Sequence, residues 1–281
     1  METGGISRIA VLMTVHNRKQ VTLSCLEALY KSHLEGCRFD VYMTDDGCTD
    51  GTPEAVMSDF PDVRILPGDG SLFWNRGMHK AWTAAAGVGY DYYLWLNDDT
   101  VLFVDSIQRL LDCSSRYEDK ALIVGATCSS DDSEEVTYGG WIDGRLLGLS
   151  KDDQECDTIS GNIVLVPQFI FDILGYNDPY SRHSTGDTDY GLRAKEKGLS
   201  VICAQGLYGI CDLHPHKPIW MDASYPLKKR ISNLYSPLGN NPIEFFHFRK
   251  RHYGFLPACM TFLSNYLHVL FPRLWYHKVK K

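Results

Sequence analysis

Residues 91–100 read DYYLWLNDDT, an apolar and aromatic run that stops at one asparagine and two aspartates. Short runs of this kind, bounded by turn residues, are typical of buried strands. Similar runs occupy residues 9–14, 39–44 and 63–66, and the stretches after them have helical spacing. This alternation predicts an α/β fold with a mostly parallel sheet that helices cover on both faces. The helices expected between the strands span residues 19–30, 52–60 and 74–86.

Residues 121–165 follow a different pattern, because their strand-like runs are separated by Gly and Asp turns rather than by helices. We expect them to form a mixed-sheet extension of the same domain. A helix is predicted at residues 187–197, where Gly198 ends it. The strands expected in this part of the chain span residues 121–127, 135–138, 145–149, 158–166, 199–204 and 207–212.

Polar residues follow three of the predicted strands at the point where each strand ends. They are HN (16–17), DDG (45–47) and NDD (97–99). In parallel sheets, ligands bind beyond the carboxyl ends of the strands, so these residues are candidates for one site. For DDG, a plain turn with a helix cap is the alternative interpretation.

Asp98 and Asp99 are adjacent carboxylates at the end of an apolar strand. Such a pair repels itself and loses hydration, an arrangement that a divalent cation usually sustains. Carboxylate oxygens favour Mg²⁺ or Mn²⁺, which would bridge to phosphate oxygens. A plain turn remains the alternative here as well.

Three further motifs have both a functional and a structural interpretation. GDGSLFWNRGMHKAW (68–82) places glycines and Arg76 around a helix start that a diphosphate could approach, although its spacing matches no standard nucleotide loop. Asp187 and Asp189 open a helix, as caps or with one of them as a general base. His214 follows a strand, where a histidine is more often structural than a metal ligand.

The chain has 281 residues, 44% of them hydrophobic and 22% charged, which is enough apolar material for a sizeable core. Its nine cysteines are scattered without a CxxC pair, which favours a reduced, cytoplasmic protein over a disulfide scaffold or a zinc site. The first 17 residues lack the long apolar run and the cleavage site of a signal peptide, so secretion is not expected.

Charge is distributed unevenly along the chain. From Lys228 to the end, ten Lys and Arg stand against one acid, Glu244, a net +9, whereas residues 1–227 hold eighteen against thirty-four, a net −16. A basic, aromatic tail on an acidic body is not a nucleic-acid-binding design and indicates contact with an anionic membrane surface. The 21 residues between Arg251 and Arg273 carry no Asp, Glu, Lys or Arg but are too polar to span a bilayer, so an interfacial helix is expected. A helix packed on the rest of the chain and a homo-oligomer interface are the alternatives.

Taken in order, these motifs resemble those of the inverting nucleotide-sugar glycosyltransferases of the GT-A fold, family 2, over roughly residues 8–216. LFWNRGM, DYGLRA and the late histidine are similar to the branch of bacterial rhamnosyl- and galactofuranosyltransferases of surface polysaccharide synthesis. The resemblance implies a Rossmann-like sheet with a mixed-sheet extension and a C-terminal helical tail. The segments that carry it are VLMTVHNRKQVTLSCLEAL (11–29), TDDGCTDGT (44–52), NRG (75–77), WLNDDT (95–100) and GDTDYGLRAKEKG (186–198).

The resemblance also implies roles for individual residues. Asp187 would be the catalytic base, Asp99 and His214 the metal ligands, and Asp98 a ligand of the ribose or the metal. Two positions depart from the family pattern, because Asn97 replaces the first Asp of the DxD element and Gly186 replaces an acid before the base. The residues implied for donor binding are Thr14, Asn17, Asp46, Asn75, Arg76, Gly77 and Asp98.

We therefore expect an inverting transferase that moves a sugar from a UDP- or dTDP-linked donor to a hydroxyl of a glycan or glycolipid acceptor, with Mg²⁺ or Mn²⁺ as cofactor. Its catalytic domain would span residues 1–216, with a donor-binding half at about 1–100 and an acceptor half at about 101–216. Residues 217–281 would form the tail, which holds the enzyme on the inner face of the membrane. The alternatives are a sugar nucleotidyltransferase and a non-catalytic, membrane-associated assembly protein of the same fold.

Overall fold

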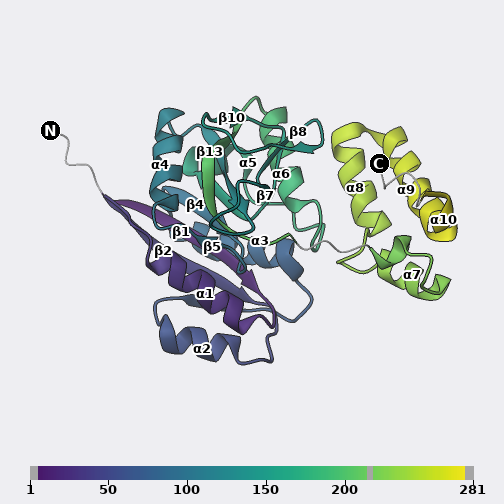
Figure 1. Ribbon diagram of the computed structural model, residues 1–281, viewed down its shortest axis with the longest axis horizontal. Helices are drawn as coiled ribbons and strands as arrows, with labels where there is room; N and C mark the ends of the chain where they lie inside the picture. The colour runs from purple at the N-terminus through teal and green to yellow at the C-terminus, as the bar shows by residue number, and fades with distance from the viewer. Residues whose placement is uncertain (1–5, 214–217, 276–281) are drawn as a thin grey trace. The chain divides into compact units, whose positions relative to one another are not determined.

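The protein is described from a computed structural model, which covers residues 6–213 and 218–275. The chain divides into two compact units. The first comprises Met1–Pro179 and Asp187–Leu213, and the second comprises Tyr180–Gly186 and His214–Lys281. Both are drawn in Figure 1, and each is described by itself.

A ten-stranded sheet forms the centre of the first unit. Its strands are β1 (Ser7–Val15), β2 (Cys37–Asp45), β3 (Arg64–Pro67), β4 (Tyr92–Leu96), β5 (Val101–Leu102), β6 (Ala121–Cys128), β7 (Val136–Tyr138), β10 (Gln154–Glu155), β12 (Ile163–Pro167) and β13 (Ser200–Ile210). The order is β10-β13-β6-β12-β4-β1-β2-β3, with β5 on β13 and β7 on β6. The strands β4, β1, β2 and β3 are parallel, whereas β12 is antiparallel to both of its neighbours. The predicted mostly parallel sheet with a mixed extension is therefore confirmed.

Helices cover both faces of this sheet (Figure 1). The buried side chains of β1 alternate between the two faces of the sheet. Ile9 and Val11 pack against one group of helices, and Ala10 and Leu12 pack against a second group. The first group is α1 (Lys19–Tyr30), α2 (Thr52–Asp59) and α4 (Ser106–Arg116). The second group is α3 (Phe73–Ala86), α5 (Gln168–Leu174) and α6 (Gly186–Glu196).

The stretch 158–166, expected as one strand, forms two strands in different sheets. Thr158–Ile159 (β11) pairs with β8 (Gly140–Ile142), which also pairs with β9 (Arg145–Leu146). The chain then turns through residues 160–162 and enters the large sheet as β12. The expectation of one strand was wrong because the two halves find different partners, and the turn between them reaches the candidate site.

The second unit is helical. A capping asparagine starts α8, because the Asn241 side chain accepts hydrogen bonds from the backbone N–H groups of Ile243 and Glu244. Segment 180–186 joins this unit through an ion pair of 2.7 Å between Arg182 and Glu244. No helix within the described residues is both long and apolar enough to cross a membrane. The helical elements are η1 (Ile219–Met221), α7 (Leu227–Leu234), α8 (Pro242–Tyr253), α9 (Phe255–Leu270) and α10 (Pro272–Trp275).

Candidate functional site

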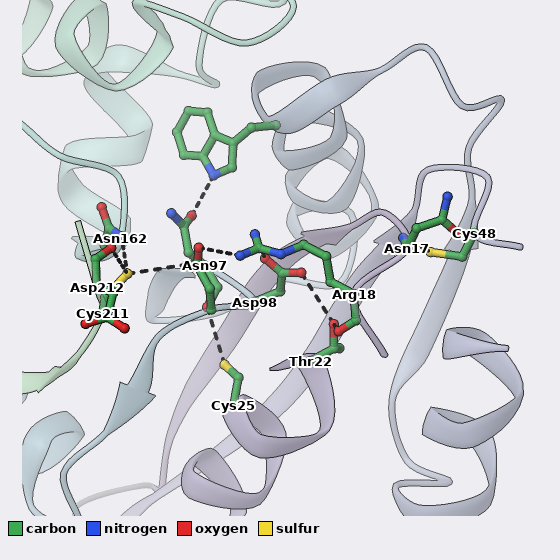
Figure 2. Close-up of polar contacts among 12 residues, drawn as sticks. Asn17, Arg18, Thr22, Cys25, Cys48, Asn97, Asp98, Asn162, Cys211 and Asp212 are labelled. Carbon is green, nitrogen blue, oxygen red and sulfur yellow. Dashed lines mark hydrogen bonds and ion pairs between the residues drawn. The ribbon is translucent and has the colours of Figure 1, made fainter. Parts of the chain in front are cut away.

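Segments from four parts of the chain meet at one edge of the large sheet. β1 and β4 are parallel neighbours, so the residues that follow them share this edge. β12 is antiparallel to β4, so the turn that precedes β12 lies at this edge. On the other side of β12, β6 is antiparallel to it and β13 is parallel to β6, so β13 runs in the same direction as β4 and its carboxyl end reaches the same edge. The four segments are residues 16–18, 97–99, 160–162 and 211–212, and Figure 2 labels residues from each of them.

The two adjacent carboxylates are bonded to one guanidinium group (Figure 2). Arg18 Nη1 donates to Asp98 Oδ1 at 3.1 Å, and Arg18 Nη2 donates to Asp99 Oδ2 at 2.8 Å. The Thr22 hydroxyl oxygen also lies 3.4 Å from Asp98 Oδ2. The Asp98 and Asp99 side chains are only 7% and 13% exposed, whereas Arg18 is 38% exposed. The Arg18 side chain is therefore the most solvent-accessible member of the group.

Burial dominates the electrostatics of this pair. It raises the pKa of Asp98 to about 7, an effect that Arg18 opposes and the Asp99 charge reinforces. The Cys211 thiol lies 3.6 Å from Asp99 Oδ1, and burial together with this carboxylate raises the pKa of Cys211 to about 12. Cys211 is therefore a neutral thiol at neutral pH.

Asp98 and Asp99 fit a hard divalent cation, because they present carboxylate oxygens from adjacent residues. Among the residues that the structure describes, no group of three or more His, Cys, Asp or Glu side chains is arranged to hold a metal. His214, the predicted second ligand, lies outside the described residues. The carboxylates thus suit an ion that completes its coordination with water or with a bound phosphate, as Mg²⁺ commonly does.

Trp74 connects this group to the predicted base. Its indole Nε1 donates to Asn97 Oδ1 at 2.6 Å. Its ring lies against Gly161, where a Cβ would be 2.4 Å from Trp74 Cζ2 and 3.4 Å from the Cβ of Asp187. The Gly161 N–H in turn donates to Asp187 Oδ2 at 3.0 Å. Asn97 and Asp187 are therefore joined through one indole ring and one glycine.

Of the two acids that open α6, the geometry distinguishes Asp187 from Asp189. Asp189 is buried and forms an ion pair of 2.9 Å with Arg193 one turn further along. Asp187 instead accepts backbone N–H groups of Thr188 and Gly161. Burial raises the pKa of Asp187 above its ordinary value, and these hydrogen bonds oppose the rise. A carboxylate that is held in place and has a raised pKa is suited to accept a proton.

Asp46 shapes the loop that leads into α3. Its Oδ1 accepts the N–H groups of Gly70 and Leu72 at 2.9 and 3.2 Å, and its Oδ2 accepts the N–H of Phe73 at 2.8 Å. Phe73 has a φ of 57°, a left-handed conformation that this carboxylate helps to hold. A nucleoside contact by Asp46 stays a prediction, and it would use an oxygen that already accepts backbone hydrogen bonds.

Asn17 and the NRG segment also make intramolecular contacts. Asn17 Oδ1 accepts the Thr49 N–H at 2.7 Å and so fixes the turn after β2. Asn75 is fully buried and donates to the Asp178 carbonyl at 2.7 Å, while Arg76 Nε donates to the Pro179 carbonyl at 2.9 Å. These residues therefore fix the positions of the segments around Thr49 and around Asp178 and Pro179.

Thr14 and Gly77 lie in contact where α3 crosses β1. A Cβ at position 77 would be 2.1 Å from Thr14 Oγ1, so α3 approaches the strand closely only because residue 77 is glycine. Thr44 Oγ1 donates to the Gly77 carbonyl at 2.8 Å. These positions therefore set how closely α3 approaches the sheet.

Four members of the site were not predicted from the sequence: Arg18, Trp74, Gly161 and Cys211. Arg18 had one local signal, because it follows directly on the polar residues at the end of β1. The other three had none, since the contact of Trp74 with Asn97 spans 23 residues and that of Cys211 with Asp99 spans 112.

The sequence matches a known family over much of this unit. Residues 10–173 match the family described as "Glycosyl transferase family 2". Over 85 residues the chain is 34% identical to the "N-acetylglucosaminyl-diphospho-decaprenol L-rhamnosyltransferase" of Mycobacterium tuberculosis. That match covers 27% of this chain and 28% of the relative's length, well under two thirds of it.

Solved structures share the fold at low sequence identity. The structure of S. aureus TarS superposes with a TM-score of 0.58 and 11% identity, over 95% of this chain and 53% of TarS. The mannosyltransferase PcManGT from Pyrobaculum calidifontis, solved with GDP-Man and Mn²⁺, gives a TM-score of 0.55 and 14% identity, over 96% of this chain and 83% of that one. The predicted GT-A-like fold is confirmed by these likenesses. Because the family match spans more than half of the chain, the chain belongs to glycosyl transferase family 2.

Proposed function

We propose that the protein moves a sugar from a UDP- or dTDP-linked donor to a hydroxyl of a glycan or lipid-linked acceptor, with inversion at the anomeric carbon. The observation that carries this proposal is the convergence at the sheet edge. There an acidic pair suited to a cation directly follows Asn97, which is joined through Trp74 and Gly161 to the half-buried carboxylate of Asp187. A single displacement needs both parts, one for the leaving diphosphate and one for the acceptor proton.

On the donor side, Asp98 and Asp99 would hold Mg²⁺ or Mn²⁺, with His214 as the predicted further ligand. When bound, the cation supplies positive charge that neutralises the departing diphosphate. The loop held by Asp46 and the segments held by Asn17 and Asn75 would enclose the nucleoside. Likenesses to TarS residues 1–349, solved with UDP, and to PcManGT, solved with GDP-Man and Mn²⁺, support this assignment.

On the acceptor side, Asp187 would take the proton of the acceptor hydroxyl. As the new C–O bond forms at the anomeric carbon, the bond from that carbon to the diphosphate oxygen breaks on the opposite face. The hydrogen bond from the Gly161 N–H fixes the position of the Asp187 carboxylate. General-base catalysis of this kind contributes about 10²–10⁴-fold in rate.

The acceptor is proposed to be a sugar on a polyprenyl diphosphate. The mycobacterial relative is named for such an acceptor, N-acetylglucosaminyl-diphospho-decaprenol. A lipid-linked acceptor requires the enzyme to work at a membrane surface, and α9 offers a surface for that.

α9 exposes a continuous apolar strip. The five side chains repeat at helical spacing and range from 48% to 70% exposed, so none is covered by the described part of the chain. The opposite side of the helix packs inward, and it includes Asn265, which accepts a hydrogen bond from Asn240. The strip consists of Leu256, Met260, Leu263, Leu267 and Leu270.

We propose that this strip lies on an anionic leaflet at the cytoplasmic side of the membrane. Lys250 and Arg251 are exposed at the end of α8, directly before α9 begins. An apolar strip flanked by basic residues is typical of an interfacial helix, which binds by apolar burial and by attraction to anionic lipid.

The experiment that tests the proposed activity incubates the protein with UDP- and dTDP-sugars, Mn²⁺ and a polyprenyl-diphosphate-linked N-acetylglucosamine. We expect one sugar to be transferred, and we expect Asp99→Ala to lose the transfer and to bind the nucleotide more weakly, because the diphosphate loses its cation. The absence of transfer and of thermal stabilisation by every donor would contradict the proposal, as would full activity of Asp99→Ala.

A further inference from the structure

Arg18 holds the carboxylate oxygens that a divalent cation would need. Its two terminal nitrogens each bond one carboxylate, at 3.1 Å to Asp98 and 2.8 Å to Asp99. A cation bound to the same oxygens would stand beside a guanidinium group, and like charges at such a distance repel. The Arg18 guanidinium and a divalent cation therefore compete for the same carboxylate oxygens of Asp98 and Asp99.

The backbone of Arg18 is fixed, but its side chain has room to move. The Arg18 carbonyl accepts hydrogen bonds from both the N–H and the hydroxyl of Thr22, each at 3.0 Å, which anchors it at the start of α1. The side chain is 38% exposed, whereas the carboxylates beneath it are nearly buried. The guanidinium can thus leave toward solvent without any movement of β1 or α1.

A diphosphate is a suitable new partner for the released guanidinium. The planar fork of arginine bonds phosphate oxygens in pairs, as it bonds carboxylates. Arg18 lies at the carboxyl end of β1, on the sheet edge where the donor is proposed to bind. The same group can therefore neutralise the carboxylates before the donor arrives and the diphosphate afterwards.

We propose that Arg18 is a displaceable counter-ion of the acidic pair, which yields Asp98 and Asp99 to the divalent cation and passes to the diphosphate of the donor. The part of this inference that concerns the diphosphate rests on the proposed function. By linkage, a diphosphate that draws Arg18 away strengthens cation binding, and a cation strengthens diphosphate binding by the same factor. The exchange suppresses binding of the cation in the absence of donor.

The test measures Mn²⁺ binding to the metal-stripped, full-length chain without nucleotide, from the loss of the free Mn²⁺ signal in electron paramagnetic resonance. Arg18→Met removes the guanidinium, and we expect it to bind Mn²⁺ about tenfold more tightly than wild type, or about 1.4 kcal/mol. Lys19→Met is the matched control, since it removes one positive charge at the next residue and leaves in place the ion pairs of Arg18 with Asp98 and Asp99. It should bind Mn²⁺ as wild type does.

A second arm measures UDP binding in excess chelator by calorimetry. Arg18→Met should bind UDP about tenfold more weakly than wild type, and Arg18→Lys should lie between them, because it keeps the charge but loses the fork. Melting temperatures of the variants confirm that each is folded.

The inference is overturned if Arg18→Met binds Mn²⁺ no more tightly than Lys19→Met, including the case in which neither binds it. Should Arg18→Met not fold, Arg18→Lys decides in the same way. Failure of the wild type to bind UDP with or without Mn²⁺ counts against the proposed function instead, and the Mn²⁺ arm still decides whether Arg18 is the counter-ion.

Discussion

At position 161 any side chain larger than hydrogen would meet the Trp74 indole, with its Cβ only 2.4 Å from the ring. The glycine thus lets the ring bridge between Asn97 and the segment that holds Asp187. A single missing side chain therefore determines how the acidic pair and the proposed base are placed relative to each other.

We expect Gly161→Ala to displace the Trp74 ring and to break its hydrogen bond to Asn97. Overpacking of this kind lowers the free energy of unfolding by about 1–3 kcal/mol. The rate of sugar transfer should also fall, because the turn that precedes β12 shifts. Gly148→Ala is the matched control, since nothing lies within 4 Å of a Cβ there. Thermal melts and transfer rates of both variants check the prediction, and equal behaviour of the two would contradict it.

Asp187→Asn should bind donor normally and lose turnover about 10²–10⁴-fold, because it keeps the shape of the side chain and loses its basicity. The base acts only when ionised, and burial raises its pKa, so wild-type kcat should fall as pH falls through a pKa above that of an ordinary aspartate. Transfer rates at saturating substrate, from about pH 4 to pH 8, check both statements. A fall of less than about tenfold in the variant would leave Asp187 only a helix cap.

The members of the site that could be predicted from sequence are those with a local signal. Asp98 and Asp99 end an apolar strand, and Asp187 opens a helix, so neighbouring residues reveal both. Arg18 and Trp74 join the site through contacts with residues 80 and 23 positions away. Such contacts depend on which strands become neighbours, and that cannot be deduced from local periodicity.

Where the helix α3 packs on the strand β1, helix propensity and packing have opposite effects at residue 77. Alanine in a helix interior is favoured over glycine by about 1 kcal/mol. Here, however, its Cβ would lie 2.1 Å from Thr14 Oγ1 and 2.7 Å from Thr14 Cβ, on a strand that cannot recede. Overpacking should therefore exceed the gain in propensity.

We expect Gly77→Ala to lower the free energy of unfolding by about 1–3 kcal/mol, as measured by urea denaturation. Gly87→Ala, at the end of the same helix, is the control, because its nearest contact is an ordinary 3.8 Å to the Ala84 carbonyl. It should be neutral or slightly stabilising. A stabilised Gly77→Ala would show that the helix moves off the strand at little cost.

The helices and strands with one dominant periodicity could be predicted nearly to the residue. The helix expected at residues 19–30 is α1, Lys19–Tyr30, and that expected at residues 74–86 is α3, Phe73–Ala86. The sequence reading includes neither α4 nor α5, and it merges β11 with β12. The merged run contains Ser160, Gly161 and Asn162 between its two strand-like parts, and the partner strands show that the break falls there.

At the scale of the whole molecule, the uneven charge and the exposed strip of α9 belong to the same unit. The +9 segment from Lys228 onward includes α8 and α9, whereas the first unit, which contains the candidate site, carries most of the acids. Truncation of α9 would not test its membrane role alone, because Val269 is buried with Trp220 and Leu234 in a small core. Exposed positions allow a cleaner test.

We expect the protein to sediment with vesicles that contain phosphatidylglycerol but not with vesicles of phosphatidylcholine alone, because each basic residue near an anionic leaflet contributes about 1 kcal/mol to the free energy of binding. High salt should weaken this binding, because it screens the attraction. The double substitution Leu263→Gln with Leu267→Gln removes two exposed leucines and should weaken binding more than tenfold, because partial burial of two such side chains is worth about 2 kcal/mol or more. Val104→Gln changes an equally exposed apolar residue of the first unit and serves as the control, and neither variant should melt earlier than wild type. Transfer to the polyprenyl-linked acceptor on vesicles should fall with the binding, while transfer to a short, water-soluble analogue of the acceptor should not. If the double variant binds vesicles as wild type does, α9 does not contact the membrane through this strip, and a dimer that dissociates on the same substitution would identify the strip as a contact between two copies of the chain.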